Sequence, residues 1–156
     1  METIDVSIII NAPIEKVFDA LSDHESYKKI TGILSAKLLK PGDTEKNGKG
    51  AIRQLDGIGI TFIEEIPAFE RNKYYEYKVL ECYLNLGLVR IEIPLIHELG
   101  RITLQEKEDG VEVRWISIID LNIPFAKEIA TKFFAFHGSD AFVFMLRQMK
   151  HQLEDN

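Results

Sequence analysis

The residues most able to do chemistry in this chain are an arginine and a glutamate that a short hairpin would place opposite each other. Alternating segments on either side of residues 56–59 predict two antiparallel strands. A pairing of Asp56 with Thr61 sets the register, and Arg53 then lies directly opposite Glu64. The remaining residues of that face are mostly apolar: Ala51, Leu55, Ile60, Phe62 and Ile66. We therefore expect an ion pair inside an apolar concavity.

Two interpretations of this pair stay open. It either orients a polar group of a ligand or serves as a structural cross-strand bridge, since deleting one partner would leave a buried charge unpaired. A register slip of one residue would move both Arg53 and Glu64 to the outer face. The first interpretation makes the apolar face the wall of a binding site.

Aromatic residues on two further predicted strands extend this wall. Tyr77 and Val79 share a face of the strand at residues 74–80, and Trp115 shares a face with Ser117 on the strand at residues 111–121. Tyr and Trp combine a large apolar area with one hydrogen-bonding atom, which suits an amphipathic ligand, although a plain core shows the same pattern. The predicted ligand-contacting residues are Arg53, Phe62, Glu64, Tyr77, Val79, Trp115, Ser117, Phe134, Phe142, Met145 and Met149.

The segment 125–153 predicts one long helix whose apolar stripe packs on the sheet. The stripe recurs at spacings of three and four residues and consists of Ile129, Phe133, Phe134, Phe142, Met145, Leu146, Met149 and Leu153. Gly138 predicts a bend or a close backbone approach within it. Phe136 and Phe144 fall off the stripe, which suggests a lid, a dimer contact or a membrane-dipping patch.

The histidines form no recognisable catalytic or metal-binding arrangement. His24, His97, His137 and His151 show no ligand spacing with one another or with Cys82. His97 lies near a strand start and is expected at the mouth of the cavity. If the protein is an enzyme, His97, Tyr77 or Glu64 would act as acid or base. His137 and Asp140 are three residues apart on a helix, a spacing typical of a surface hydrogen bond. We expect no metal and no cofactor.

The elements that must position these residues are a strand at 4–10, two short helices, about six antiparallel strands and the long helix. The first helix starts near Pro13 with Asn11 or Ala12 at its cap, and the second ends at Gly32. Residues 82–97 are ambiguous: they extend a strand, form a separate one, or make a loop over the cavity. One helix cannot cover a flat sheet of six or seven strands, so we predict an α+β domain over 1–156 with a strongly curved sheet and a space beneath it.

Composition excludes several classes of protein. The chain has 156 residues and a net charge of -6, which argues against general nucleic-acid binding. Its single cysteine, Cys82, excludes an internal disulfide and a multi-thiolate zinc site. No apolar run approaches the ~18 residues that cross a bilayer, and the N-terminus lacks a signal-peptide pattern, so we expect a cytoplasmic protein.

One stretch of the chain, residues 27–53, is basic although the net charge of the whole chain is negative. Residues 27–53 contain seven basic residues against Asp43 and Glu45: Lys28, Lys29, Lys37, Lys40, Lys46, Lys49 and Arg53. The stretch is either a solvated loop or a site of transient contact with anionic lipid.

Four segments resemble the START-like (Bet v 1-like) superfamily, in particular its polyketide cyclase/dehydrase and lipid-transport branch. They are NAPIEKVFDALSDHESYKKITG, FIEEIPAFERNKYYEYKV, GRITLQEKEDGVEVRWISIIDL and MLRQMKHQLED. The resemblance implies a helix-grip fold, in which a curved antiparallel sheet grips a long C-terminal helix around an apolar cavity.

Three functions fit these observations. The first is a carrier or sequestering protein, a monomer or homodimer, that holds a lipid-, quinone- or polyketide-like molecule in the cavity. The second is a cyclase or dehydratase that uses the same cavity. The third is a protein-interaction module, similar to a co-chaperone or an assembly factor, that uses the outer sheet or the patch of Phe136 and Phe144.

Overall fold

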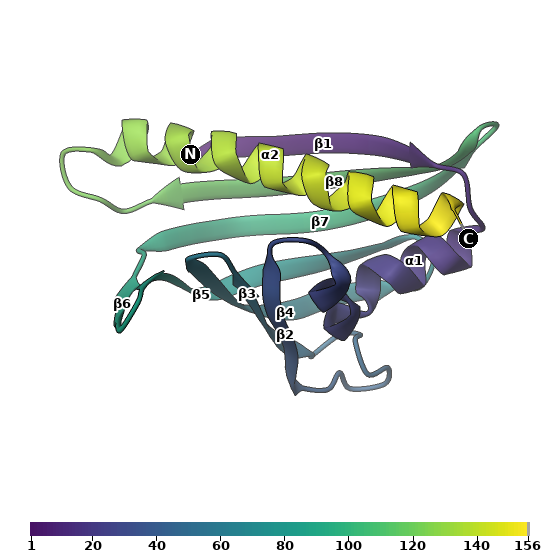
Figure 1. The fold of residues 1–156 in the computed structure, drawn as a ribbon, viewed down its shortest axis with the longest axis horizontal. Helices are drawn as coiled ribbons and strands as arrows, with labels where there is room; N and C mark the ends of the chain where they lie inside the picture. Colours follow the sequence, from purple (N-terminus) through teal and green to yellow (C-terminus); the bar gives the residue numbers. More distant parts are fainter. Residues whose placement is uncertain (156) are drawn as a thin grey trace.

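Alternating apolar residues form one antiparallel sheet in the computed structural model, which describes residues 1–155. Its strands run in the order β1-β8-β7-β5-β4-β3-β2, and β6 pairs with β5 beside this path (Figure 1). They are β1 (Glu2–Ile10), β2 (Ile33–Lys40), β3 (Ile52–Gly57), β4 (Ile60–Glu70), β5 (Tyr74–Leu86), β6 (Val89–Glu92), β7 (Leu95–Lys107) and β8 (Gly110–Leu121). The predicted α+β class and curved antiparallel sheet are confirmed, and the ambiguous residues 82–97 continue β5 and then form the separate strand β6.

Two short helices and one long helix complete the fold. They are α1 (Ile14–Ser22), the 3-10 helix η1 (His24–Lys29) and α2 (Lys127–Glu154). Pro13 occupies the N-cap of α1 with an extended backbone, so the prediction of a cap at Asn11 or Ala12 is wrong. The backbone N–H of Asn11 instead donates to Glu154 at the end of α2. Among the described residues, no helix is long and apolar enough to cross a bilayer.

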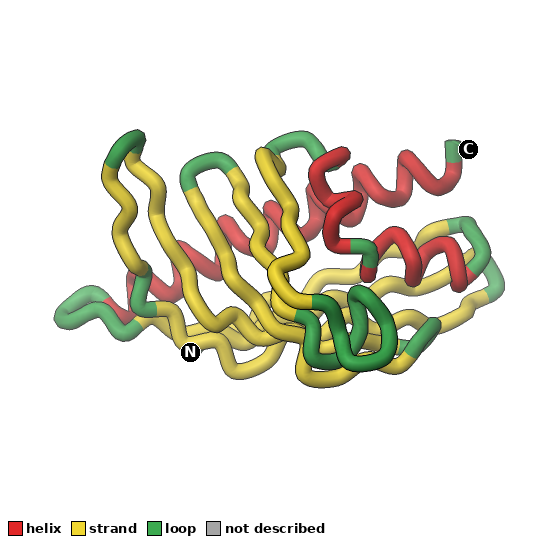
Figure 2. Tube along the Cα trace, turned by 90° about the horizontal axis from the view of Figure 1, so that it is seen from below, coloured by secondary structure: helices red, strands yellow, loops and turns green. Residues whose placement is uncertain are grey.

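The start of α2 differs from the prediction. The helix begins at Lys127 rather than Phe125, because Phe125 has a left-handed backbone with φ 64°. Ile129 and Phe133 are largely exposed and do not pack in the core, whereas Phe134 of the predicted stripe packs against Ile4 and Ile119. The physical reason is that α2 lies against β1 and β8, at one side of the sheet, and leaves the other strands uncovered. Figure 2 shows the sheet bending around α2, with α1 and η1 at the end where the C-terminus lies.

The sheet divides into two walls between β5 and β7. These strands pair only from Tyr74–Thr103 to Tyr77–Gly100. Beyond that point the edge of β5 is taken by β6, while β7 continues along β8 as far as Leu95. The two walls diverge toward one end of the molecule (Figure 1). Because one helix cannot fill the space between them, a cavity is expected at this end.

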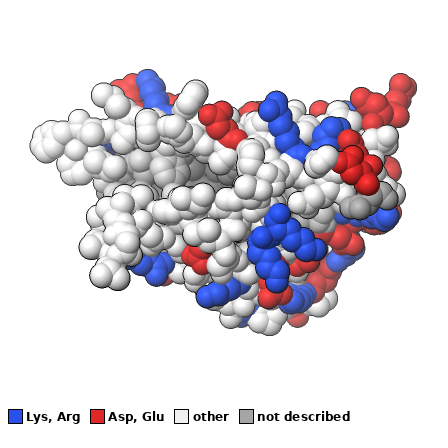
Figure 3. Space-filling model, in the orientation of Figure 1, with Lys and Arg blue, Asp and Glu red and all other residues white. Residues whose placement is uncertain are grey.

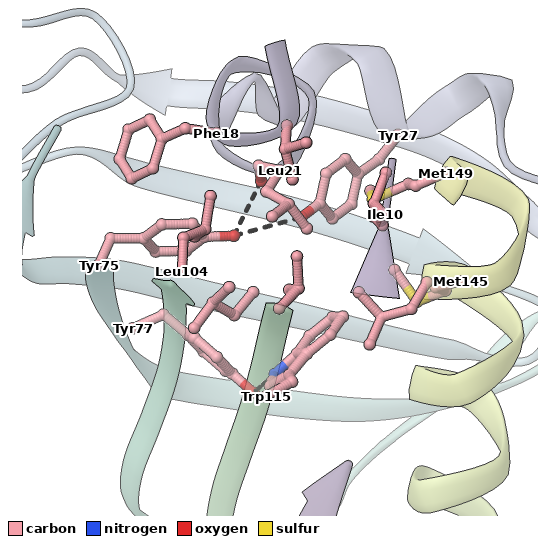
Figure 4. Close-up of a cluster of buried hydrophobic side chains, with 14 of the residues drawn as sticks. Ile10, Phe18, Leu21, Tyr27, Tyr75, Tyr77, Leu104, Trp115, Met145 and Met149 are labelled. Carbon is pink, nitrogen blue, oxygen red and sulfur yellow. Dashed lines mark hydrogen bonds between the residues drawn. The ribbon is translucent and has the colours of Figure 1, made fainter. Parts of the chain in front are cut away.

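A dense core closes the opposite end (Figure 4). The Oη atoms of Tyr27 and Tyr75 both donate to the Leu21 carbonyl, at 2.6 and 2.8 Å. This carbonyl lies in the last turn of α1, where the helix itself supplies no donor. The two tyrosines therefore tie α1 to the sheet.

Two glycines allow close packing around this framework. A Cβ on Gly100 would lie 2.3 Å from Cζ of Tyr77, so the Tyr77 ring covers the bare backbone of β7. A Cβ on Gly138 would lie 2.8 Å from Cδ1 of Ile4, which confirms the predicted close approach of the long helix. Gly100 thus determines where the Tyr77 ring lies.

We predict that Gly100→Ala destabilises the fold by about 1–3 kcal/mol, because the added methyl group forces a buried ring to move. Urea unfolding followed by Trp115 fluorescence measures the change. Thr103→Ala, at an exposed position of the same strand, is the control and should shift stability by less than about 0.5 kcal/mol. Equal, small effects of both variants would show that the Tyr77 ring does not constrain β7.

Candidate ligand-binding cavity

A cavity of about 720 Å³ lies between the sheet and α2. This volume is within the range of small-molecule binding sites. Its walls come from η1, β1–β5, β7, β8 and α2, and most of the lining side chains are apolar. Figure 3 shows the hollow beside α2, surrounded by uncharged side chains. A solid core, which would have undercut the carrier and the enzyme hypotheses, is not what residues 1–155 form.

The structure brings together ten of the eleven residues predicted to contact a ligand. The residues that line the cavity are Arg53, Phe62, Glu64, Tyr77, Val79, Trp115, Ser117, Phe134, Phe142 and Met145. Their roles toward a ligand stay predictions. Met149 is the exception: it packs in the closed-end core, because it lies one helical turn beyond Met145, where α1 covers the sheet.

The predicted ion pair lies on the inner wall. Arg53 pairs with Glu64 in the register between β3 and β4, and Arg53 Nε donates to Glu64 Oε2 at 2.8 Å. Both residues are less than 10% exposed. The Arg53 guanidinium also lies over the rings of Tyr75 and Tyr77, at 5.5 and 5.8 Å. Burial disfavours the charge, but Glu64 together with Tyr75 and Tyr27 outweighs burial and raises the pKa of Arg53, so the guanidinium stays charged.

Aromatic rings form the adjacent wall. Trp115 Nε1 donates to Tyr77 Oη at 2.8 Å, and the Trp115 ring stacks on Phe142 with ring centroids 4.0 Å apart. Burial, followed by the charge of Glu64, raises the pKa of Tyr77 well above its usual value. Tyr77 is therefore a neutral phenol at physiological pH.

His97 bridges the gap where β5 leaves β7. The backbone N–H of Val79 donates to His97 Nδ1 at 3.2 Å, so the ring proton is on Nε2, which donates to Ser117 Oγ at 3.0 Å. Burial, followed by the positive charge of Lys78, lowers the pKa of His97 to about 4. The expectation that His97 lies at the mouth is wrong, because its ring satisfies a strand N–H inside the wall.

His24 lines the cavity and was not among the predicted site residues. Its Nε2 donates to the Gln54 carbonyl at 2.6 Å, and within residues 1–155 its buried Nδ1 has no hydrogen-bond partner. Burial, followed by the charge of Arg53, lowers the pKa of His24 to about 3. A 3-10 helix places residues three apart on one face, so the spacing of His24 and Tyr27 was the available signal.

Part of the cavity lining was missed because β5 carries one extra residue, so its inward-facing positions change from odd-numbered to even-numbered residues. A register shift between Ile63 and Glu64 of β4 occurs opposite Val79 and Glu81. Inner-facing residues of β5 therefore change from Tyr77 and Val79 to Cys82, which is buried, and Leu84, which lines the cavity. Sequence alternation alone cannot show such a bulge.

Contacts can be described for two further sets of predicted residues. Arg53 is buried and Lys46 is paired with Glu25, so these two members of the basic stretch 27–53 are not free cations, and contact of the stretch with anionic lipid stays a prediction. The His137 ring packs against Phe133 and Phe136. No group of three or more His, Cys, Asp or Glu among the described residues could hold a metal ion.

We predict that stability falls as pH decreases from about 6.5 to 4. His97 and His24 have lower pKa values in the fold than the 6.5 of a free histidine, so the unfolded chain binds more protons in this range. Their stabilising contribution is complete above pH 6.5 and is lost as pH falls toward 4 and 3. For His97 alone the loss is roughly 3 kcal/mol.

Urea unfolding at several pH values tests this. His97→Gln should flatten the pH dependence, whereas His151→Gln, at an exposed site, should leave it unchanged. An equally steep dependence in His97→Gln would contradict the prediction.

Comparisons with known proteins agree with this geometry. The model of the family described as "Polyketide cyclase / dehydrase and lipid transport" matches residues 1–154. The solved structure of XoxI from Bacillus cereus is 20% identical with a TM-score of 0.68, and the match covers 99% of this chain and 97% of that one. A START superfamily protein from Mycobacterium smegmatis is 12% identical with a TM-score of 0.66, covering 98% and 97%.

A curated relative extends the likeness to yeast. "Suppressor of lethality of KEX2 GAS1 double null mutant protein 1" from Saccharomyces cerevisiae is 23% identical over 136 residues. The match covers 79% of this chain but 38% of the relative, so the chain spans less than half of that protein's length. The solved structures show a shared fold, and the resemblance to the START-like superfamily is confirmed. Since the family model covers nearly every residue, the chain belongs to the polyketide cyclase/dehydrase and lipid transport family.

Proposed function

We propose that this protein is a non-catalytic carrier that holds one hydrophobic or amphipathic small molecule between the sheet and α2. The observation that supports this most strongly is the apolar cavity of about 720 Å³, whose few polar side chains are held by partners in its own walls. Affinity would come mainly from removal of apolar surface from water. That the protein acts in the cytoplasm, as a monomer or homodimer, stays part of the proposal.

The state of the titratable groups favours binding over catalysis. A general acid or base works best with a pKa near the working pH. His97 and His24 have pKa values of about 4 and 3, and the pKa of Tyr77 is raised far above neutrality. Glu64 is bonded to Arg53. These pKa values and the bond between Glu64 and Arg53 support binding over acid–base catalysis.

The polar network also indicates what kind of ligand fits. Ser117 Oγ accepts the Nε2 proton of His97, and Tyr77 Oη accepts the Nε1 proton of Trp115. Each of the two hydroxyl groups carries one proton. A hydrogen bond between Ser117 and Tyr77 uses only one of these two protons. One donor is left, and both hydroxyls line the cavity. We infer a ligand with an apolar body and an acceptor oxygen, such as a carbonyl.

An enzyme of the cyclase or dehydratase kind is the second candidate, favoured by the description of the family. It would use Tyr77, Glu64 or His97 on a reactive chain folded within the cavity. Turnover of an added polyketide-like substrate that is lost in Tyr77→Phe, Glu64→Gln or His97→Ala would favour this candidate.

We predict that the protein purifies with a small molecule bound, which native mass spectrometry would detect. Extraction and reanalysis after incubation should return the molecule chemically unchanged. A protein that carries no molecule and takes up none from a lipid extract would contradict the carrier role.

We also predict that acetylnaphthalene binds more tightly than ethylnaphthalene, which has a similar shape but lacks the carbonyl oxygen. One hydrogen bond accounts for roughly a threefold to tenfold difference in Kd. Trp115 is the single tryptophan and lines the cavity, so its fluorescence reports occupancy. The double variant Tyr77→Phe/Ser117→Ala should lose the preference, and Tyr83→Phe, whose hydroxyl faces Glu81, should keep it. Equal affinities in the unmodified protein would contradict a free donor.

A further inference from the structure

The hairpin of β5 and β6 carries an open strand edge. β6 pairs with β5 on one side, and within residues 1–155 no strand pairs with it on the other. All four of its residues, Val89, Arg90, Ile91 and Glu92, are exposed. Figure 1 places β6 at the outline of the molecule, at the end where the two walls diverge. An unpaired edge of this kind can accept a further strand.

The hydrogen-bond pattern shows which backbone groups face the open edge. The backbone N–H of Ile93 donates to the Cys82 carbonyl at 2.8 Å, so these two residues form a hydrogen-bonded pair between the two strands. Along an antiparallel pair of strands, such pairs alternate with pairs that share no hydrogen bond. Arg90 and Glu92 belong to the second kind, so their N–H and C=O groups point away from β5. A strand added at this edge would bond to these two residues.

The inner face of β6 is apolar and continues the lining of the cavity. Val89 and Ile91 lie opposite Leu86 and Leu84 of β5, so these four side chains share a face. Leu84 and Ile93 also line the cavity. Val89 is 57% exposed and Ile91 is 47% exposed, although both belong to this face. A neighbouring strand with an apolar face of its own would remove them from water.

The outer face of β6 carries one positive and one negative charge, two residues apart. The Arg90 guanidinium lies 3.8 Å from the centroid of the Tyr83 ring, and within residues 1–155 neither Arg90 nor Glu92 forms an ion pair. Charged side chains on an edge strand often prevent pairing with another chain. Two charges of opposite sign do not prevent it when an antiparallel copy of the same strand places each opposite the other.

We propose that two copies of this chain associate through β6, in an antiparallel pair with a two-fold axis at Ile91. In this register Arg90 of each copy lies directly opposite Glu92 of the other, and both pairs can exchange their free backbone hydrogen bonds. Ile91 lies opposite its own equivalent, and Val89 lies opposite Ile93 of the second copy. The apolar inner face of the joined hairpins then extends from one cavity to the other.

The charges and the backbone together favour this register and this partner. A shift that keeps the same backbone groups paired places Arg90 opposite its own equivalent, where like charges repel. The opposite shift pairs Glu92 with itself and Arg90 with Pro94, which has no N–H to donate. The strand therefore contains the complement of its own charges, which favours a second copy over an unrelated segment. The inference concerns the homodimer that the proposed function leaves open, and it does not depend on which molecule the cavity holds.

Sedimentation velocity over a wide range of protein concentrations tests the proposal. We expect a weak dimer, because one short strand from each copy buries little surface. Arg90→Glu and Glu92→Arg each place like charges opposite each other and should raise the dissociation constant of the dimer roughly tenfold. Lys37→Glu, at an exposed position of the edge strand β2, is the control and should leave it unchanged. Urea unfolding checks that each variant is folded.

A charge exchange distinguishes this interface from any other. The double variant Arg90→Glu/Glu92→Arg restores opposite charges and should recover the dimer, as should a mixture of the two single variants. Ile91→Cys should form an intermolecular disulfide under mild oxidation, because opposite residues that share no hydrogen bond lie about 4.5 Å apart. Leu39→Cys, on β2, should not, and Cys82 is buried. A monomer at every concentration, or a dimer that the charge variants leave unchanged, would overturn the proposal.

Discussion

The separation of β5 from β7 beyond Tyr77 and Gly100 is the constraint on which the rest of the structure depends. Strands that separate leave backbone donors without partners, and such donors are costly when buried. Two features provide partners for backbone groups on this edge of β5. The His97 ring accepts a hydrogen bond from the N–H of Val79, and β6 pairs with the end of β5. If the two strands paired along their whole length, the walls would close and the cavity would disappear. The cavity is therefore a property of the backbone pairing as well as of side-chain size.

The polar groups of the cavity fit this view. A buried ion pair such as Arg53–Glu64 often contributes little net stability compared with apolar residues of equal volume. Here it fills the inner wall with groups that cannot collapse into the open space, because each charge is held to its partner. The hydrogen bond from Trp115 to Tyr77 and the stacking of Trp115 on Phe142 hold the adjacent wall in the same way. The walls keep their shape through hydrogen bonds, an ion pair and ring stacking. An apolar core would keep its shape through close packing of side chains that fill the interior.

The two ends of the molecule have different roles. At the closed end, Tyr27 and Tyr75 join α1 to the sheet, and Met149 completes a dense core. At the open end, Phe125 is strained, and other apolar side chains such as Leu88 and Ile129 also face outward. A fold stabilised at one end can tolerate exposed and strained residues at the other.

The elements that local pattern controls were predictable from sequence. The pairing of Arg53 with Glu64 follows from the alternation of apolar and polar residues on both sides of a short turn. The long helix follows from apolar residues that recur three and four positions apart. Other features needed the tertiary structure. The bulge in β5 that turns Leu84 inward, the 3-10 helix that buries His24 and the separation of Met149 from Met145 all depend on neighbours distant in the chain. The amino-acid sequence by itself determined which faces are apolar and which side chains pair across a turn, because those depend on adjacent residues. Only the tertiary structure decided which apolar face lines a cavity and which is core, because that depends on where two strands separate and how much of the sheet one helix can cover.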